Sequence, residues 1–180
     1  MEYILLNDRQ KEKYSNDLLT LIQLCDNDFV PPLSQRNSTV QKTLKPHDNA
    51  KSENGVLKYY NEMMHQYILA VLEGSVLVGF GSFRENVVSD VIPEDYTPNI
   101  YISTIIMHPN TRGKGIATGL YTHLLESFGN SRNMITRTWS TNTAHIRILE
   151  KFGFAELHCI PNDRGNEIDT VYFLKSNSNG

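Results

Sequence analysis

The sequence predicts an α/β fold in a single domain that spans residues 1–180. Segments whose apolar residues recur every three or four positions, typical of helices on a core, alternate with short runs rich in β-branched and aromatic residues, typical of strands. A glycine-rich loop joins one of these strand-like runs to a helical pattern. A chain of 180 residues has the usual length of one domain and can bury roughly two thirds of its unfolded surface.

The N-terminal third combines one predicted strand with two helices. The strand covers residues 3–6, and the helices cover residues 10–25 and 56–65. The first helix has its apolar residues at Leu18, Leu19, Ile22 and Leu24. Residues 28–54 between the helices are rich in proline and small polar residues, which predicts a long loop with room for one further short helix.

The middle of the chain begins with a predicted hairpin. Its strands cover residues 67–72 and 76–83, and Glu73-Gly74-Ser75 forms the turn. A loop at residues 85–99 leads to a strand at residues 100–107, which Pro109 ends because proline cannot continue a central strand. The later elements are a helix from Ile116 to near Gly129, a strand at 134–140, a helix opening at Asn142, strands at 154–160 and 170–174, and a frayed tail at 177–180.

The loop from Pro109 to Ala117 reads Pro-Asn-Thr-Arg-Gly-Lys-Gly-Ile-Ala and predicts a phosphate-binding turn. Glycines let the backbone turn sharply, so that several N–H groups can point at a pyrophosphate from the positive end of the next helix. A nucleotide-triphosphate loop does not fit, because Gly115 follows Lys114 where Ser or Thr is required. A dinucleotide fingerprint fits weakly, because Thr118 stands where the third glycine is expected.

Two segments resemble motifs of the GCN5-related N-acetyltransferase (GNAT) superfamily. The pattern Arg112-x-x-Gly115-x-Ala117 resembles the acyl-CoA signature of that family, which is Arg/Gln-x-x-Gly-x-Gly/Ala. Residues 142–154 resemble its downstream motif, in which an Asn opens a helix that ends in Glu-Lys-aliphatic-Gly-Phe. The two segments occur in the family's order and at about the family's separation.

The resemblance implies a mixed, mostly antiparallel sheet that is splayed between its fourth and fifth strands and flanked by helices, with acetyl-CoA as acyl donor and no metal. The residues that it implies for CoA binding are Ile105, Ile106, Met107, Arg112, Gly113, Lys114, Gly115, Ile116, Ala117, Thr118 and Asn142. Several of these residues also have a purely structural explanation. The glycines can serve only a turn, Lys114 can be a solvated lysine, and Asn142 can be a helix cap.

The resemblance does not identify every catalytic group. A backbone N–H near Ile106 or Met107 is placed as in the family to stabilise the oxyanion. The family's usual acidic tyrosine is replaced by Leu149, so another hydroxyl or water must protonate the CoA thiolate. The candidate hydroxyls are Tyr101, Tyr121 and Tyr172, and the candidate bases are Glu73, His108, Asp163, Glu167 and Asp169.

The implied function is transfer of an acetyl group to a primary amine, by direct attack in a ternary complex. The expected acceptor is a small metabolite or an amino-acid-like molecule. The loop at 85–99 carries Glu85, Asp90, Glu94 and Asp95 without Lys or Arg, which favours a cationic amine unless the loop is merely a solvated acidic segment. The alternatives are a catalytically silent acyl-CoA-binding module, a protein or peptide N-acetyltransferase, and a non-enzymatic interaction domain.

Composition excludes several other classes. A net charge of −3 without a Lys/Arg cluster argues against nucleic acid as a partner. The six histidines are scattered and the two cysteines form no ligand pattern, so no metal site is expected. No signal peptide or membrane-spanning run is present, which predicts a cytoplasmic protein that does not bind membranes, as a monomer or homodimer.

Overall fold

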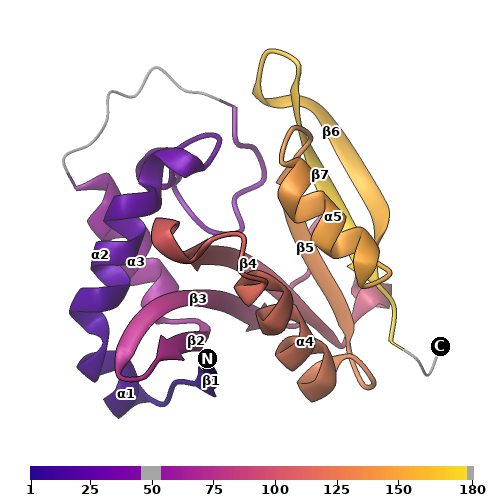
Figure 1. Ribbon diagram of the computed structural model, residues 1–180. Coiled ribbons are helices and arrows are strands. Elements are labelled where there is room, and N and C mark those ends of the chain that lie inside the picture. Colours follow the sequence, from indigo (N-terminus) through magenta and orange to yellow (C-terminus); the bar gives the residue numbers. More distant parts are fainter. Residues whose placement is uncertain (46–53, 178–180) are drawn as a thin grey trace.

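A computed structural model describes residues 1–45 and 54–177. The chain forms one seven-stranded mixed sheet in the order β1-β2-β3-β4-β5-β7-β6, with helices on both faces (Figure 1). The predicted α/β class and the mixed sheet are confirmed. No helix within the described ranges is both long enough and apolar enough to cross a membrane.

Four antiparallel strands form the first part of the sheet. They are β1 (Glu2–Leu5), β2 (Tyr67–Glu73), β3 (Val76–Glu85) and β4 (Asn99–Met107). Strand β2 is a continuous apolar run because both of its faces are covered. Ile68, Ala70 and Leu72 belong to a core shared with residues of α2 (Ser15–Cys25) and α3 (Gly55–Met64). Leu69 and Val71 belong to a second core with α4 (Ile116–Phe128) on the opposite face.

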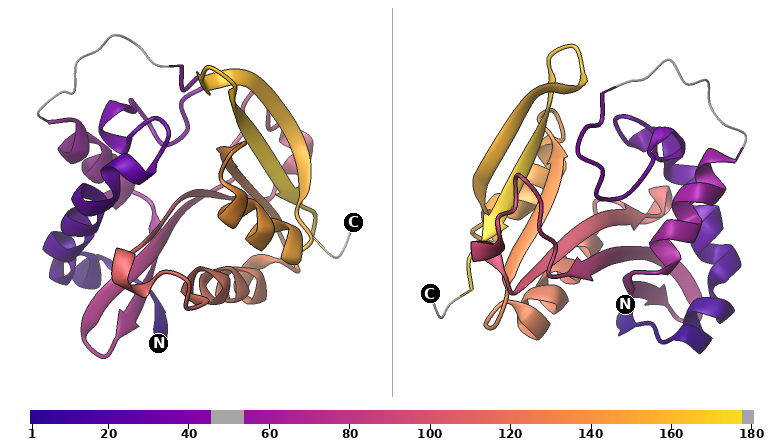
Figure 2. Two further views of the ribbon diagram at one scale, coloured as in Figure 1. Left: turned by 45° about the horizontal axis from the view of Figure 1, so that its top comes forward. Right: turned by 180° about the vertical axis from the view of Figure 1, so that it is seen from behind.

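The second part of the sheet contains β5 (Asn133–Trp139), β7 (Ile168–Lys175) and β6 (Ala155–Gly165), joined by antiparallel pairing. Helix α5 (Thr143–Lys151) connects β5 to β6. Its residues Ile146 and Leu149 pack into the core that also holds α4. Figure 2 shows α4 and α5 next to each other beneath the two parts of the sheet.

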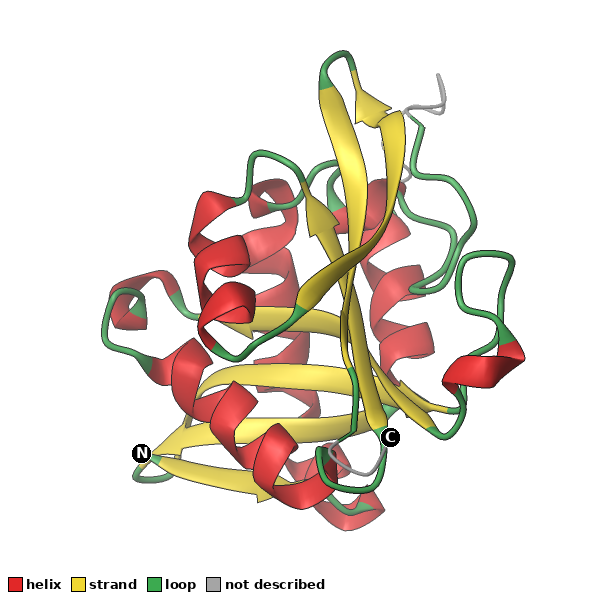
Figure 3. Cartoon of the chain, turned by 90° about the vertical axis from the view of Figure 1, so that its right-hand side faces the viewer, coloured by secondary structure: helices red, strands yellow, loops and turns green. Residues whose placement is uncertain are grey.

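The two parts of the sheet share only a short parallel ladder. Residues Asn99–Ile102 of β4 pair with Asn133–Thr136 of β5, and the register ends there. The β3–β4 register shifts at the same point, so that Ser103 is an extra residue on β4. A β-bulge bends its strand and increases the local twist, which turns the rest of β4 away from β5 (Figure 3). The predicted opening between the fourth and fifth strands is confirmed.

Some predicted boundaries were wrong. The helix expected at residues 10–25 is two helices, α1 (Asp8–Lys13) and α2, which meet at Tyr14. Asn7 and Gln10 form a capping box that starts α1 earlier than the apolar pattern suggests. Strands β6 and β7 continue well past the predicted 154–160 and 170–174, because their hairpin pairs as far as Gly165 and Ile168.

The two predicted long loops contain short 3₁₀ helices. Leu33–Gln35 forms one inside the predicted loop at 28–54, and Glu94–Tyr96 forms another inside the loop at 85–99. Residues 46–53 of the first loop lie outside the described residues. Of the predicted tail at 177–180, residues 178–180 also lie outside them.

Candidate functional site

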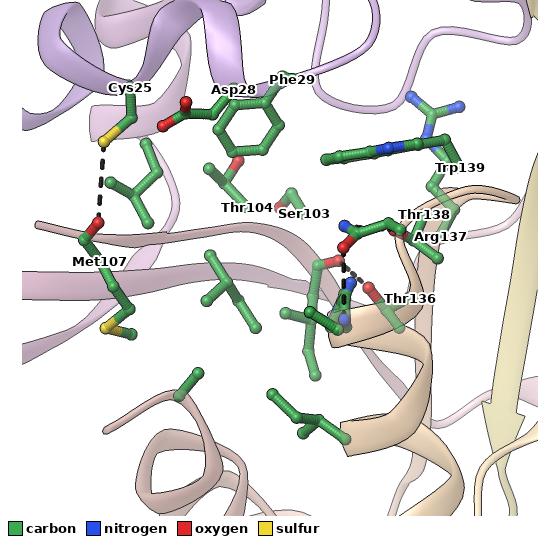
Figure 4. A pocket seen from close by; sticks show the side chains of 18 of the residues that line it. Cys25, Asp28, Phe29, Ser103, Thr104, Met107, Thr136, Arg137, Thr138 and Trp139 are labelled. Carbon is green, nitrogen blue, oxygen red and sulfur yellow. Dashed lines mark hydrogen bonds between the residues drawn. The ribbon is translucent and has the colours of Figure 1, made fainter. Parts of the chain in front are cut away.

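A cavity of about 330 Å³ lies where the sheet opens between β4 and β5. Its walls come from the second half of β4 (residues 102–107), the end of β5 (136–139), the first turns of α5 and the segment that follows α2. Figure 4 shows the side chains that line it, with Met107 and Cys25 at one end and Arg137 and Trp139 at the other. The opening of the sheet therefore produces a site with walls from distant parts of the chain.

The open edge of β4 exposes backbone groups to this cavity. His108 N–H donates to Val78 O at 2.8 Å, toward β3. Successive residues of an antiparallel strand point their N–H and C=O groups to opposite sides, so those of Ile106 face β3 and those of Ile105 and Met107 face the opening. Ile106 therefore contributes only its side chain to the cavity wall.

Polar groups from α2 and the glycine-rich loop meet at Met107. The Met107 carbonyl accepts from Arg112 Nε at 3.2 Å and from Cys25 Sγ at 3.8 Å. Arg112 Nη2 also donates to Asp28 Oδ2 at 2.6 Å and to Cys25 Sγ at 3.3 Å. Burial raises the pKa of the Cys25 thiol, with Arg112 opposing the shift, so the thiol stays protonated at neutral pH.

The glycine-rich loop leads directly into the N-terminus of α4. Gly113 and Gly115 have φ angles of +74° and +76°, in the left-handed region that glycine adopts without strain. Gly115 is the N-cap and offers no side-chain acceptor, and its carbonyl accepts a hydrogen bond from Gly119 N at 3.0 Å. The amides of the first turn therefore remain available to an anion, and residues 112–115 are exposed to solvent.

Asn142 begins α5 and also lines the cavity. Its side-chain oxygen accepts from His145 N at 3.3 Å, and its Nδ2 donates to Thr138 Oγ1 at 3.1 Å. The cap suggested by the sequence is present. His145, one turn later, also lines the cavity and was not singled out in the sequence analysis.

His145 connects the cavity to Tyr121, one of the candidate hydroxyls. Their Oη and Nε2 atoms are 2.7 Å apart. Burial lowers the pKa of His145 to about 4, so the imidazole is neutral at pH 7. Burial likewise raises the pKa of the Tyr121 phenol. The Tyr121 side chain itself is buried in the core next to α5 and does not line the cavity.

The other candidate tyrosines also lie outside the cavity wall. Tyr101 and Tyr172 are 2% and 5% exposed and pack together in a small core with Ile92 and Ile135. Burial raises the pKa of Tyr101 to about 12, and Tyr172 Oη accepts from Arg137 Nη1 at 3.1 Å. Leu149 is fully buried in the core, which removes any polar group from the family's usual acid position.

The candidate bases and the acidic loop are not among the residues that line the cavity. His108 caps a 3₁₀ turn by accepting from Asn110 N, and Asp163 is buried with Thr43 and Thr170 as partners. Glu73, Glu167 and Asp169 lie in or beside hairpin turns.

In the acidic loop, Asp90 pairs with Lys42, and Glu85 lies 3.5 Å from Arg132. The negative field expected from that loop is thus partly neutralised, and none of its acidic residues lines the cavity.

Three arginines that the sequence did not single out line the cavity: Arg36, Arg137 and Arg164. Arg36 follows a 3₁₀ turn, Arg137 lies on β5, and Arg164 lies near the end of β6. Arg36 and Arg164 are 7% and 3% exposed. An arginine within the predicted 134–140 strand was the only sequence signal for this group.

Comparison with known proteins identifies related sequences and folds. The profile of the acetyltransferase (GNAT) family matches residues 34–154. A search of curated proteins finds no match.

Solved structures share the fold at low sequence identity. The yncA protein of Salmonella typhimurium with its cofactor acetyl-CoA has a TM-score of 0.65 at 16% identity, covering 100% of this chain and 95% of that one. An aminoglycoside 6'-N-acetyltransferase complexed with coenzyme A has a TM-score of 0.65 at 15% identity, covering 97% and 96%. Ribosomal-protein-alanine N-acetyltransferase from Brucella melitensis has a TM-score of 0.60 at 16% identity, covering 98% and 99%.

Proposed function

This chain belongs to the GNAT acetyltransferase family, and from that premise we propose that it acetylates the primary amine of a small metabolite or amino-acid-like molecule. Acetyl-CoA is the acyl donor. The observation that carries the proposal is the open edge of β4 beyond Ile102, which lies beside the glycine-rich N-terminus of α4. A cofactor with a diphosphate and an amide-containing arm matches both features.

We assign the diphosphate to the loop and first turn of α4. The amides of Gly113, Lys114, Gly115, Ile116, Ala117 and Thr118 are the proposed donors. Left-handed glycines beside a helix N-terminus suit a doubly charged anion, since the N–H groups point outward together. Arg112 positions the loop instead, because its N–H donates to the Pro109 carbonyl at 3.3 Å and its side chain is engaged by Asp28 and by the Met107 carbonyl.

The pantetheine arm would continue along β4 as a substitute for the missing strand. The Ile105 carbonyl and the Met107 N–H face the opening and need hydrogen-bond partners, which the two amides of the arm can supply. The Met107 carbonyl already accepts from Arg112 and Cys25. Ile106 and Ala117 would contact the arm through their side chains, and Asn142 lies on the opposite wall. This arrangement directs the thioester toward the end of the cavity that contains Trp139.

The reaction proceeds by direct attack. The neutral amine nitrogen bonds to the thioester carbonyl carbon, negative charge develops on the carbonyl oxygen, and the carbon–sulfur bond then breaks. The Ile105 N–H is the proposed donor to that oxygen, because it faces the opening farther from the loop than Met107 does, and a preorganised backbone dipole stabilises developing charge. The amine loses a proton to water, and the CoA thiolate takes one.

Water is a better candidate than the buried phenols for protonating the thiolate. Tyr101 lies outside the cavity wall, and burial raises its pKa to about 12, which makes it a weaker acid. Tyr172 already accepts a hydrogen bond from Arg137. We therefore assign neither tyrosine a catalytic role.

The cavity volume favours a small acceptor. A volume of about 330 Å³ is at the lower end of the range for small-molecule sites, and the end of the pantetheine arm must share it. A folded protein surface could present only an extended terminus to such a site.

An acetylation assay tests the proposal. Purified protein is incubated with acetyl-CoA and panels of amino acids, polyamines, aminoglycosides and N-terminal peptides, and acetylated product is measured against acetyl-CoA alone. We expect turnover with small amines. Turnover confined to peptides would contradict the small-molecule acceptor, and CoA binding without turnover of any amine would indicate a catalytically silent module.

A further inference from the structure

We propose that the acceptor amine also carries an anionic group, a carboxylate or a phosphonate, that binds to the arginine cluster formed by Arg36, Arg137 and Arg164. The proposal deepens the assignment of this cavity as an acetyl-transfer site and rests on it. It also reverses the preference for a cationic amine that the acidic loop suggested.

The cluster brings three positive charges to one end of the cavity. Its members come from the segment after α2, from β5 and from β6, and all three line the cavity wall. The pKa of Arg137 is raised despite its burial, because of Tyr101 and Tyr172. Burial, with repulsion from neighbouring arginines of the cluster, lowers the pKa of Arg36 to about 10 and that of Arg164 to about 9. Both values leave the guanidinium groups charged at pH 7. The fold therefore concentrates like charges where burial makes them costly.

No carboxylate within the described ranges forms an ion pair with any member of the cluster. The two nearby acids, Asp26 and Asp163, have other partners. Asp26 accepts from Ser34 N and Oγ, and Asp163 accepts from Leu44 N and two threonine hydroxyls. These acids attract the arginines at longer range but leave the positive charges without a contacting anion.

The guanidinium groups also keep hydrogen-bonding capacity for a ligand. Each guanidinium has five N–H donors. Arg36 uses its Nε and Nη2 on the Pro31 carbonyl alone. Arg137 donates to the Gln41 and Thr39 carbonyls and to Tyr172, and Arg164 donates to the Val30 carbonyl and to Thr170. Neutral carbonyls and hydroxyls satisfy some donors, but they do not balance the charge.

Two aromatic rings hold parts of the cluster in position. The Arg36 guanidinium lies 5.2 Å from the centre of the Phe29 ring, and that of Arg164 lies 5.7 Å from the Trp139 ring. The two rings are 5.9 Å apart, and both line the cavity. Contacts with ring faces orient a guanidinium and leave its edge available for hydrogen bonds. The cluster is thus organised before a ligand arrives, which favours bidentate recognition of a carboxylate or a phosphonate.

The direct test compares acceptors that differ only in charge. Each amino acid in the panel is assayed beside its amide and its decarboxylated amine. Aminophosphonates form a second series of anionic acceptors. We expect kcat/KM for the preferred acid to exceed that for its amide by about 10- to 100-fold, because hydrogen bonds to charged groups are the stronger ones. Comparison of kcat/KM between the carboxylate and phosphonate series identifies which anion the site prefers.

Two variants test whether the arginine cluster causes the preference for an anionic acceptor. Arg137→Gln and Arg164→Gln should each raise KM for the anionic acceptor about tenfold or more, reduce the acid-to-amide ratio, and change KM for acetyl-CoA less than about twofold. Arg9→Gln removes an equal charge from the exposed surface of α1 and should change none of these values. Circular dichroism and thermal unfolding show whether each variant is folded.

The outcomes separate the two proposals. Equal or faster turnover of amides and polyamines overturns the anionic acceptor and leaves the acetyltransferase assignment intact. Variants that lose thermal stability while keeping the wild-type acid-to-amide ratio show that the arginines only hold the loop carbonyls, which also overturns it. Absence of turnover with every amine contradicts the acetyl-transfer function of the site. The substrate series on the unaltered protein decides the point even if neither variant folds.

Discussion

At Gly115 the backbone conformation and the proposed ligand contact require the same residue. Its φ angle of +76° costs a non-glycine residue about 1–2 kcal/mol. A Cβ atom built there would meet nothing within 4 Å, so no protein atom crowds the position. The demand for glycine therefore comes from the backbone and from the space that a ligand needs, both of which the sequence motif had suggested.

Replacement of Gly115 by Val should weaken CoA binding at least about tenfold, because a branched side chain disfavours the left-handed turn and occupies the approach to the amides. Replacement of Lys114 by Ala removes one exposed, screened charge and should cost less than about threefold. Isothermal titration calorimetry with CoA measures both affinities.

Gly74→Val is the matched control. Gly74 has a φ angle of +63° and no atom within 4 Å of a built Cβ, but it lies in the β2–β3 turn. The substitution should reduce stability and leave the CoA affinity unchanged. Equal losses of affinity for Gly115→Val and Lys114→Ala would show that the amides of the loop do not hold the cofactor.

His145 should make stability depend on pH. Its pKa is lowered to about 4 in the folded state from 6.5 in the unfolded chain, so the unfolded state binds more protons between these values. Stability is therefore fully present above pH 6.5 and falls as the pH drops toward 4, by no more than about 3 kcal/mol from this residue. Urea unfolding at several pH values measures the change.

A His145→Gln variant isolates this contribution. Glutamine keeps a polar group for the Tyr121 hydroxyl but does not titrate. Its free energy of unfolding should decline less than that of the unaltered protein between pH 6.5 and pH 4. Parallel losses in the two proteins would mean that carboxylates alone cause the acid destabilisation.

Among the elements, β4 shows what local sequence can and cannot predict. Its β-branched run, the proline that ends it and the glycine-rich turn were enough to place the strand, the loop and α4 correctly. The bulge at Ser103 and the loss of pairing after Ile102 arise from contacts with β3 and β5, which no single segment encodes. The opening was expected only because two motifs resembled those of a known family.

Helix α5 provides an element-scale prediction through its cap. Asn142→Ala should lower the free energy of unfolding by about 1 kcal/mol, because the first turn loses its side-chain acceptor. Asn142→Ser should retain most of that stability, since serine is also a good N-cap. Urea denaturation compares the two variants.

The same pair of variants separates the two roles of Asn142. If its amide also contacts the pantetheine arm, Asn142→Ser should bind CoA more weakly than the unaltered protein despite its normal stability. Equal destabilisation by alanine and serine would argue that the observed cap contributes little to α5.

For the whole molecule, the site is formed by segments that are distant in the sequence. Arg36, Arg137 and Arg164 each look like ordinary polar residues when considered alone, and only the folded chain brings them to one cavity. The phosphate-binding loop was predictable because its glycines, helix start and preceding strand are contiguous. The acceptor end was not, because its chemistry depends on the way β5 and β6 face the segment after α2 (Figure 1).

The central claim is that β4 and β5 separate to receive the cofactor arm while the N-terminus of α4 holds its diphosphate. A crystal structure of the protein grown with excess coenzyme A tests this most directly. We predict pantetheine alongside Ile105 and Met107 and the diphosphate on the amides of residues 113–118. Electron density for coenzyme A at another surface, with this opening empty or filled by packed side chains, would contradict the account.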